Sequence, residues 1–132
     1  MAEWVRSVLA SAKMVAQSEW SDDEKKSIKS LLGALGPFRV LRDTMPLQYV
    51  TSFLRVAEEE GLGVNDYAKR AGVSISVMSR HLLDIGERNR KMKPGFGLVT
   101  YRANPMELRK HEYMLTPKGR QLLKKMFSAL TK

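Results

Sequence analysis

The stretch VNDYAKRAGVSISVMSRHLLDI, residues 64–85, has the pattern of two short helices joined by a tight turn. Asn65 is a good N-cap, so we expect the first helix to run over residues 66–71. Gly72 can adopt the left-handed conformation that ends a helix without strain at Cβ. Ser74 can cap a second helix almost at once. The stretch therefore predicts a helix-turn-helix.

The second helix of this pair would have a core face and an outward face. Met78, Leu82 and Ile85 recur at spacings of four and three, which is typical of the apolar stripe that packs on a core. The other residues near the helix start lie off this stripe: Ile75, Ser76, Val77, Ser79 and Arg80. A helix that presents its N-terminal residues outward can enter the major groove of DNA, so we predict that these five residues read bases.

Periodicity alone also fits any helix pair of a small α-helical domain. The glycine turn, the two caps and the outward polar set coincide as a DNA-binding motif requires, and this coincidence favours the motif.

Charge is distributed unevenly along the 132 residues. Residues 1–61 hold 8 Lys and Arg against 9 Asp and Glu, a balance of −1, whereas residues 62–132 hold 15 against 5, a balance of +10. The half that carries the helix pair can therefore bind a polyanion through phosphate contacts and counterion release. An anionic membrane surface is the alternative, but no basic amphipathic helix with an aromatic apolar face supports it.

Composition favours one globular domain inside the cell. An apolar fraction of 43% argues against wholesale disorder. No stretch has the length and apolarity of a membrane span, and Glu3, Arg6 and Lys13 interrupt what a signal peptide would need as an apolar run. The chain has no cysteine, which fits a reducing compartment and excludes a thiol nucleophile. We expect a cytoplasmic, nucleoid-associated protein that does not contact a membrane.

The sequence predicts neither an enzyme nor a metal protein. His81 and His111 are far apart and lack neighbours at ligand spacing. No P-loop, dinucleotide fingerprint or Gly-x-Ser-x-Gly motif is present. We therefore expect no catalytic residue, no metal ligand and no cofactor.

Helical patterns precede the helix pair. Residues 2–17 have a broad apolar face, which predicts a helix that is either buried in the domain or turned to a partner subunit. Ser21 and Glu24 have the spacing of a capping box and should start a second helix. The glycines and proline of residues 33–37 would end or kink it, and residues 38–42 fit either a helical turn or a brief strand.

A third helix should open at about Pro46 in its first turn and close at Gly61. Its expected apolar face comprises Leu47, Val50, Phe53, Leu54 and Ala57. Near its end stand Glu58, Glu59 and Glu60, whose side chains would point in different directions on a helix. We therefore interpret them as a solvated acidic surface rather than a metal site.

The chain beyond the helix pair is first basic and then rich in β-forming residues. A basic run can be a solvated face, but this run leaves the end of the presumed recognition helix, which favours phosphate contact. The predicted phosphate contacts are Asn65, Ser74, Arg88, Arg90, Lys91 and Lys93. Residues 96–102 and 111–115 predict a hairpin of the size called a wing. Its candidate DNA contacts are Arg102, Arg109 and Lys110.

The last helix should start at Thr116 and Pro117, with proline in the first helical position. Its apolar side is wide, like that of residues 2–17. Both terminal helices therefore carry more apolar surface than their positions require. Packed together and against copies of themselves, they would form a helical dimer interface.

The order helix, helix-turn-helix, basic run, hairpin and Thr-Pro-Lys-Gly helix resembles the MarR-type winged-helix transcription regulators. The resemblance covers roughly residues 46–125. It is carried by NDYAKRAGVSISVMSRHLLDI, by the Asn104-Pro105 turn with Arg109, and by LTPKGRQLL at residues 115–123. It implies a mainly α-helical winged helix-turn-helix with a small β-hairpin wing.

The resemblance also implies an arrangement and a function. Within one domain, 1–132, residues 1–36 and 116–132 would dimerise and residues 46–115 would form the DNA-binding lobe. The homodimer would regulate transcription, as a repressor, on a pseudo-palindromic operator in double-stranded DNA. The second helix of each pair would lie in a major groove and each wing would reach the flanking minor groove. In this family a small, often aromatic, anion can bind as effector between the dimer helices and the lobes.

The sequence departs from the family pattern at two places. The family's wing turn usually carries an Asp-Pro-Arg-Asp-Arg-Arg type run, and here Met106 and Leu108 replace two of the expected basic residues. Ile75 and Val77 are apolar for a groove-facing helix, so they either contact thymine methyl groups or pack internally.

Two other functions fit the same fold. An origin-binding, architectural or nucleoprotein-assembly protein would also bind DNA, and the apolar wing turn favours it mildly. A protein-interaction module that has lost DNA binding is the third alternative, and the charge balance of residues 62–132 argues against it.

Overall fold

The computed structural model describes residues 19–87 and 94–131, which form five α-helices and one two-stranded antiparallel sheet. The elements are α2 (Asp22–Leu41), α3 (Leu47–Glu58), α4 (Val64–Ala71), α5 (Ile75–Ile85), β1 (Val99–Ala103), β2 (His111–Leu115) and α6 (Pro117–Thr131). This order confirms the predicted mainly α-helical winged helix-turn-helix. The helix predicted for residues 2–17 lies outside the described residues.

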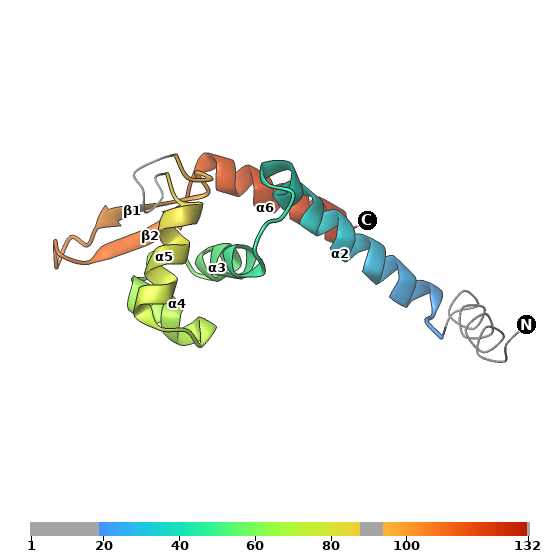
Figure 1. Cartoon of the computed structure of the whole chain (residues 1–132), viewed down its shortest axis with the longest axis horizontal. Coiled ribbons are helices and arrows are strands. Elements are labelled where there is room, and N and C mark those ends of the chain that lie inside the picture. Colours follow the sequence, from blue (N-terminus) through green and yellow to red (C-terminus); the bar gives the residue numbers. More distant parts are fainter. Residues whose placement is uncertain (1–18, 88–93, 132) are drawn as a thin grey trace, which may run out of the picture.

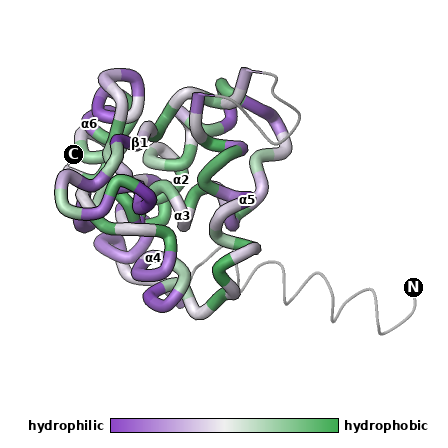
Figure 2. Tube along the Cα trace, turned by 90° about the vertical axis from the view of Figure 1, so that its left-hand side faces the viewer, coloured by the Kyte–Doolittle hydropathy of each residue, from purple (hydrophilic) through white to green (hydrophobic). Residues whose placement is uncertain are grey.

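Two regions can be distinguished in Figure 1. Helices α3, α4 and α5 and the hairpin gather at one end and are called the lobe. Helices α2 and α6 pack along each other and extend away from the lobe, and they are called the arm. Figure 2, seen from the wing end, shows hydrophobic and hydrophilic residues alternating along the helices, as expected of amphipathic helices with one buried side.

The first helix of the pair, α4, begins at Val64, two residues earlier than predicted. Gly63 is the N-cap of α4, and its N–H donates to the carboxylate of Asp66 at 3.4 Å. The prediction that Asn65 caps this helix is therefore wrong, because an acidic side chain three residues after the cap already satisfies a free amide of the first turn. Gly72 has φ of 70° and ends α4 in the left-handed conformation, as predicted. Ser74 caps α5 through a bond from the Val77 N–H at 3.2 Å, also as predicted.

The lobe has its own core. The predicted stripe of α5, Met78, Leu82 and Ile85, is fully buried. On α3 the buried side chains are Val50, Ser52, Phe53 and Val56, whereas Leu47 and Leu54 are exposed. The predicted face of α3 was therefore only partly right. An amphipathic pattern does not determine which of two neighbouring residues faces the core. The packing of α3 against both α4 and α5 determines which side of α3 is buried.

The ends of α3 also differ from the prediction. Pro46 is its N-cap rather than a residue of its first turn, and the helix ends at Glu58, three residues before Gly61. Gly61 has φ of 93° and lies in the turn that leads to α4.

Helix α2 starts at the predicted capping box. The Ser21 hydroxyl accepts the Glu24 N–H at 3.1 Å, and the Ser21 N–H donates to Glu24 at 3.0 Å. Hydrogen bonds from Ser21 lower the pKa of Glu24. The helix then continues through Pro37 to Leu41. Of the predicted alternatives, an end of the helix near Pro37 is therefore wrong, and residues 38–41 are helical rather than a strand.

Packing explains why α2 continues. Gly33 lies where α2 crosses α6, and a Cβ there would be 3.2 Å from the Cβ of Ala129. Beyond Pro37, the ring of Phe38 is buried edge-on against Phe53, with centroids 5.7 Å apart. This contact joins the arm to the lobe and offsets the hydrogen bond that a proline removes from a helix.

The wing and the last helix follow the prediction closely. Strands β1 and β2 pair with Val99 opposite Leu115 and Ala103 opposite His111, although β1 begins at Val99 rather than at residue 96. Pro117 is the first residue of α6. Gly119 is required in this helix because a Cβ there would overlap the carbonyl oxygen of Leu98.

Candidate nucleic-acid interface

The outward side of α5 is the centre of the candidate interface. Ser76, Arg80 and Leu83 follow one another at spacings of four and three, and all three are exposed. The Arg80 guanidinium donates to the Ser76 carbonyl at 3.4 Å, so this side chain lies along the helix surface. The opposite side of α5 is buried in the core. The lobe therefore holds α5 rigidly and leaves this line of side chains uncovered.

The other three predicted base-reading residues flank this line. Ile75 is 52% exposed at the start of α5, and Val77 and Ser79 are half-buried on opposite sides of the helix. Ile75 and Val77 are thus outside the buried core. Of the two alternatives for these apolar residues, contact with thymine methyl groups or internal packing, the exposure of Ile75 excludes internal packing for that residue. Leu83 was missed as a surface residue, although its position three residues after Arg80 could have indicated it.

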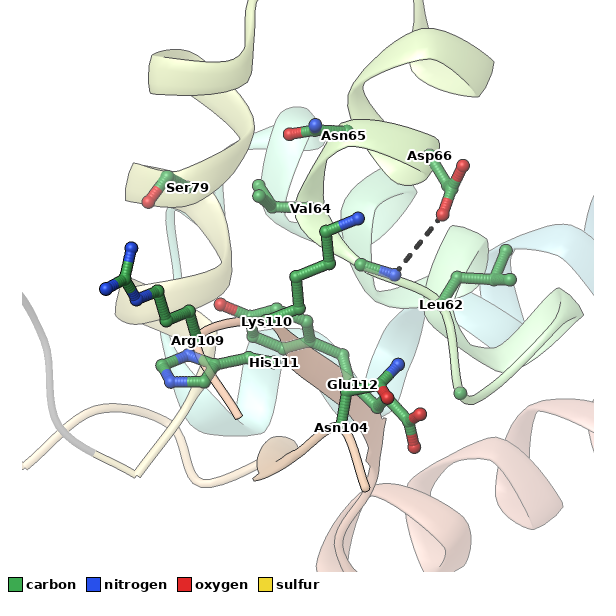
Figure 3. Close-up of a pocket in the computed structure, with 13 residues that line it drawn as sticks. Leu62, Val64, Asn65, Asp66, Ser79, Asn104, Arg109, Lys110, His111 and Glu112 are labelled. Carbon is green, nitrogen blue, oxygen red and sulfur yellow. Dashed lines mark hydrogen bonds between the residues drawn. The ribbon is translucent and has the colours of Figure 1, made fainter. Parts of the chain in front are cut away.

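A hollow of about 520 Å³ separates the helix pair from the wing. Ser79 lines it from α5, Asn65 from α4, and Arg109 and Lys110 from the wing (Figure 3). This hollow brings together residues from three of the predicted groups, namely base-reading, phosphate and wing residues. The wing and α5 therefore face a common space.

Three cations of the wing differ in their surroundings. Arg102 is paired with Glu112 at 3.1 Å, and Lys110 is paired with Glu107 at 3.0 Å. The hydrogen bond between Lys110 and Glu107 raises the pKa of Lys110. Arg109 has no carboxylate within ion-pair distance among the residues that the structure describes. It is thus the wing cation whose charge is most available to an anion.

The remaining predicted phosphate contacts have three outcomes. The Ser74 hydroxyl is engaged as the α5 cap, and it lies 3.4 Å from the Ser76 hydroxyl. Asn65 is exposed in the first turn of α4. The basic run Arg88, Arg90, Lys91 and Lys93 lies outside the described residues.

A second, smaller hollow of about 270 Å³ lies between α5 and the start of α3. The Tyr49 hydroxyl donates to the Asp84 carboxylate there at 2.6 Å, and the ring of His81 packs edge-on against Tyr49. Nδ1 of His81 is 3.4 Å from the Ser52 hydroxyl. These contacts fix the angle between α3 and α5, so they position the outward line of α5.

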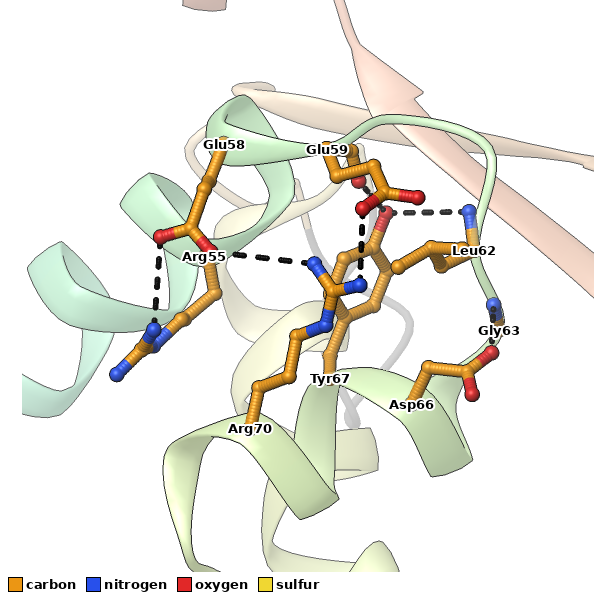
Figure 4. A network of polar contacts seen from close by, with 8 residues as sticks. All are labelled: Arg55, Glu58, Glu59, Leu62, Gly63, Asp66, Tyr67 and Arg70. Carbon is orange, nitrogen blue, oxygen red and sulfur yellow. Dashed lines mark hydrogen bonds and ion pairs between the residues drawn. The ribbon is translucent and has the colours of Figure 1, made fainter.

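Glu58 and Glu59, at the end of α3, form a network with Arg55 of the same helix and Arg70 of α4 (Figure 4). Glu59 pairs with Arg70 of α4 at 2.8 Å, and this hydrogen bond raises the pKa of Arg70. Glu58 bridges Arg55 and Arg70 at 3.5 and 3.9 Å. The acidic surface predicted here is exposed, but it is paired with arginines rather than merely solvated. No group of three or more His, Cys, Asp or Glu in the described part of the chain could hold a metal ion.

Glu60 and Tyr67 connect this network to the rest of the lobe. Glu60 accepts the Leu115 N–H at 2.8 Å and pairs with Arg120 of α6 at 2.7 Å. The buried Tyr67 hydroxyl donates to the Glu59 carbonyl at 2.7 Å, and burial raises the pKa of Tyr67. The end of α3 is thereby tied to α4, to the wing and to α6. Sequence reasoning missed these contacts because the partners are up to 60 residues apart.

None of the helices that the structure describes is both long and apolar enough to cross a membrane. This finding bears only on residues 19–87 and 94–131.

Comparison with solved structures identifies the fold. A transcriptional regulator, Tm0710 from Thermotoga maritima, superimposes with a TM-score of 0.60 at 15% identity, over 77% of this chain and 65% of that one. A MarR family transcription regulator superimposes with a TM-score of 0.55 at 16% identity, over 96% of this chain and 69% of that one. A mutant of MepR from S. aureus, bound to an oligodeoxyribonucleotide, gives 0.56 at 21% identity, over 83% of this chain and 70% of that one.

The chain therefore has the winged-helix fold of MarR-type regulators, as its sequence resemblance predicted. It spans about two thirds of the length of these structures. No protein-family model matches the chain, and no curated protein matches it in sequence.

Proposed function

We propose that this protein is a dimeric, sequence-specific DNA-binding regulator of transcription that acts as a repressor on a pseudo-palindromic operator. The observation that carries the proposal is the uncovered outward line of α5, which holds Ser76 and Arg80 on a helix whose other side is fixed in the core. A helix held in this way can enter the major groove and place its N-terminal half against base edges.

Each group of residues has a distinct role in this proposal. Arg80 and Ser76 hydrogen-bond base edges, and Ile75 contacts a thymine methyl group, which its exposure on the helix allows. Asn65 and the basic run of residues 88–93 contact phosphates, which fix the register of the protein on DNA without reading sequence. Arg109 contacts the backbone or the minor groove from the wing, because its charge has no carboxylate partner among the described residues.

The arm supports the dimer in this proposal. Ile28, Leu31, Leu32 and Leu35 form an exposed stripe along α2, and α6 carries exposed Phe127 and Leu130. Soluble monomers rarely expose a contiguous apolar surface of this kind. We propose that residues 1–36 and 116–132 pair with a second copy, and that residues 46–115 bind DNA. Two lobes related by a two-fold axis would match two half-sites. In this role the protein acts on the chromosome in the cytoplasm.

Substitution of Arg80 tests the proposal most simply. On a duplex enriched by the protein from a random pool, Arg80→Ala should cost about 1–3 kcal/mol of binding free energy and should relax sequence preference. The matched control is Lys25→Ala, which removes one positive charge from the start of α2, in the arm. The control should leave the affinity unchanged.

Two outcomes would contradict the assigned roles. Equal losses for Arg80→Ala on enriched and on random DNA would mean that Arg80 contacts only phosphate. No loss on either DNA would mean that the outward line of α5 does not touch DNA.

A further inference from the structure

The tip of the wing, residues 104–110, exposes two large apolar side chains. Met106 is 90% exposed and Leu108 is 76% exposed. Scattered exposed apolar residues are ordinary on a protein surface. Met106 and Leu108, however, lie together at the end of a projecting hairpin and form a small apolar patch there. Figure 1 shows that the hairpin reaches beyond the helices of the lobe.

The backbone of the tip is fixed in one conformation by its own hydrogen bonds. The side-chain oxygen of Asn104 accepts the N–H groups of Met106 at 2.8 Å and Glu107 at 3.2 Å. The Asn104 N–H donates to the Lys110 carbonyl at 2.7 Å, and the Lys110 N–H donates to the Glu107 carbonyl at 2.9 Å. These bonds close the turn and pre-organise its side chains. The apolar side chains are therefore presented by an ordered turn.

The charges around the tip indicate what the apolar patch of Met106 and Leu108 contacts. Lys110 and Glu107 neutralise each other in an ion pair, whereas Arg109 lines the hollow that Ser79 of α5 also lines. The surface along α5 that we propose binds DNA therefore continues through Arg109 to the two apolar side chains of the tip. An apolar wedge beside an arginine fits the minor groove, where base steps lie between two rows of phosphates.

We propose that Met106 and Leu108 insert into the minor groove as a wedge that partly unstacks a base step and bends the DNA. The inference rests on the proposed DNA-binding function and deepens it. Flexible apolar side chains such as Met and Leu are suited to such insertion, and each kink bends the duplex by about 20–90° toward the major groove. The wedge favours pyrimidine–purine steps, which unstack most easily, at the flanks of the bound site.

The experiment uses the full chain and an end-labelled duplex enriched from a random pool, at protein concentrations that saturate binding. Energy transfer between dyes at the two ends measures bending, and 2-aminopurine placed in the flank reports unstacking. The wild-type protein should shorten the end-to-end distance and raise the 2-aminopurine fluorescence. The double variant Met106→Ala, Leu108→Ala should lose at least half of both changes and bind roughly tenfold more weakly.

A second variant separates a wedge from a simple contact. Met106→Arg adds a positive charge at the same exposed position, so it should bind any DNA at least as tightly as the wild type while bending it less. Arg109→Ala is the matched control within the tip, because it should lower affinity and the salt dependence of binding but keep the bend at saturation. All three variants alter exposed side chains and leave the folded lobe intact.

Any other outcome overturns the wedge, and the outcomes differ in whether the proposed function also fails. A duplex that is bound but straight, or bent equally by the double alanine variant, overturns the wedge and leaves the proposed function standing. A chain that binds no duplex overturns both. A double variant that changes self-association but not bending would assign the tip to contacts between copies of this chain instead.

Discussion

The lobe and the arm use apolar residues in opposite ways. In the lobe, the largest side chains of the core, such as Phe53, Tyr67 and Met78, are fully buried by elements of the same chain. In the arm, α2 buries only Ala34 and Phe38 among its 20 residues and leaves a leucine-rich stripe exposed. The lobe therefore completes its own core, whereas the arm has an apolar surface that only another surface can cover. The two regions should therefore respond differently to substitution.

The largest effect is expected in the lobe core. Phe53→Ala removes a ring that packs against Phe38 and should lower the free energy of unfolding by about 3–5 kcal/mol. Leu47→Ala on the same helix is the control and should change it by less than about 0.5 kcal/mol, because Leu47 is exposed. Urea unfolding followed by circular dichroism measures both. Similar losses for the two variants would mean that the buried and exposed sides of α3 are wrongly assigned.

The next effect concerns the arm. Leu31→Lys combined with Leu32→Lys places two charges on the exposed stripe, and should weaken self-association by about 100-fold, equivalent to roughly 2.7 kcal/mol. Sedimentation over a concentration series measures this, with Leu47→Lys as a control that adds charge to the lobe. If the double variant still sediments as a dimer, the stripe is not the interface.

A smaller effect tests the connection between the two regions. Glu60→Ala leaves the Leu115 N–H without its acceptor and Arg120 without its partner, and should cost about 1–2 kcal/mol of unfolding free energy. Glu60→Gln keeps a side-chain oxygen for the Leu115 N–H and should therefore cost less. Equal losses for both variants would show that the negative charge, and not the backbone bond, makes the connection.

The smallest effect is pH-dependent. Tyr67→Phe removes the bond to the Glu59 carbonyl and should cost about 1 kcal/mol at neutral pH. Because burial raises the pKa of folded Tyr67 above the ordinary value near 10, its contribution is complete below about pH 10 and is lost as the pH rises further. The difference between wild type and variant should thus shrink above about pH 10. Tyr113, whose pKa burial also raises, will keep some alkaline sensitivity in the variant.

Local signals made much of the lobe predictable from sequence. The Gly72 turn, the Ser74 cap and the stripe of Met78 and Leu82 each depend on residues within one or two turns of each other. Strand β2 was predicted with its observed bounds for the same reason. Such features are set by neighbours in the chain, so a sequence pattern is enough to locate them.

Apart from the cap of α4, where Asp66 pairs with nearby Gly63, the errors arose where distant residues decide. One expectation was that α2 ends near Pro37, but packing of Gly33 near Ala129 and of Phe38 against Phe53 keeps it helical to Leu41. Exposed Leu47 looks like a core residue in a periodic pattern, and only packing against α4 and α5 shows which side of α3 is buried.

The candidate site was predictable as a set of residues but not as a surface. The outward position of Arg80 followed from the period of α5. In contrast, the hollow that unites Ser79 with Arg109 depends on how the wing packs against α4. The pairing of Glu59 with Arg70 likewise depends on the angle between two helices. Spacing along the chain contains no information about such angles.

The most direct test of the account is to select duplexes from a random pool with the purified protein, sequence them, and footprint the best one. We predict salt-sensitive binding, an enriched inverted repeat with half-sites about one helical turn apart, and one lobe protecting each half-site. Binding without any enriched sequence would contradict base reading by α5. An enriched single half-site would contradict pairing of lobes through the arm.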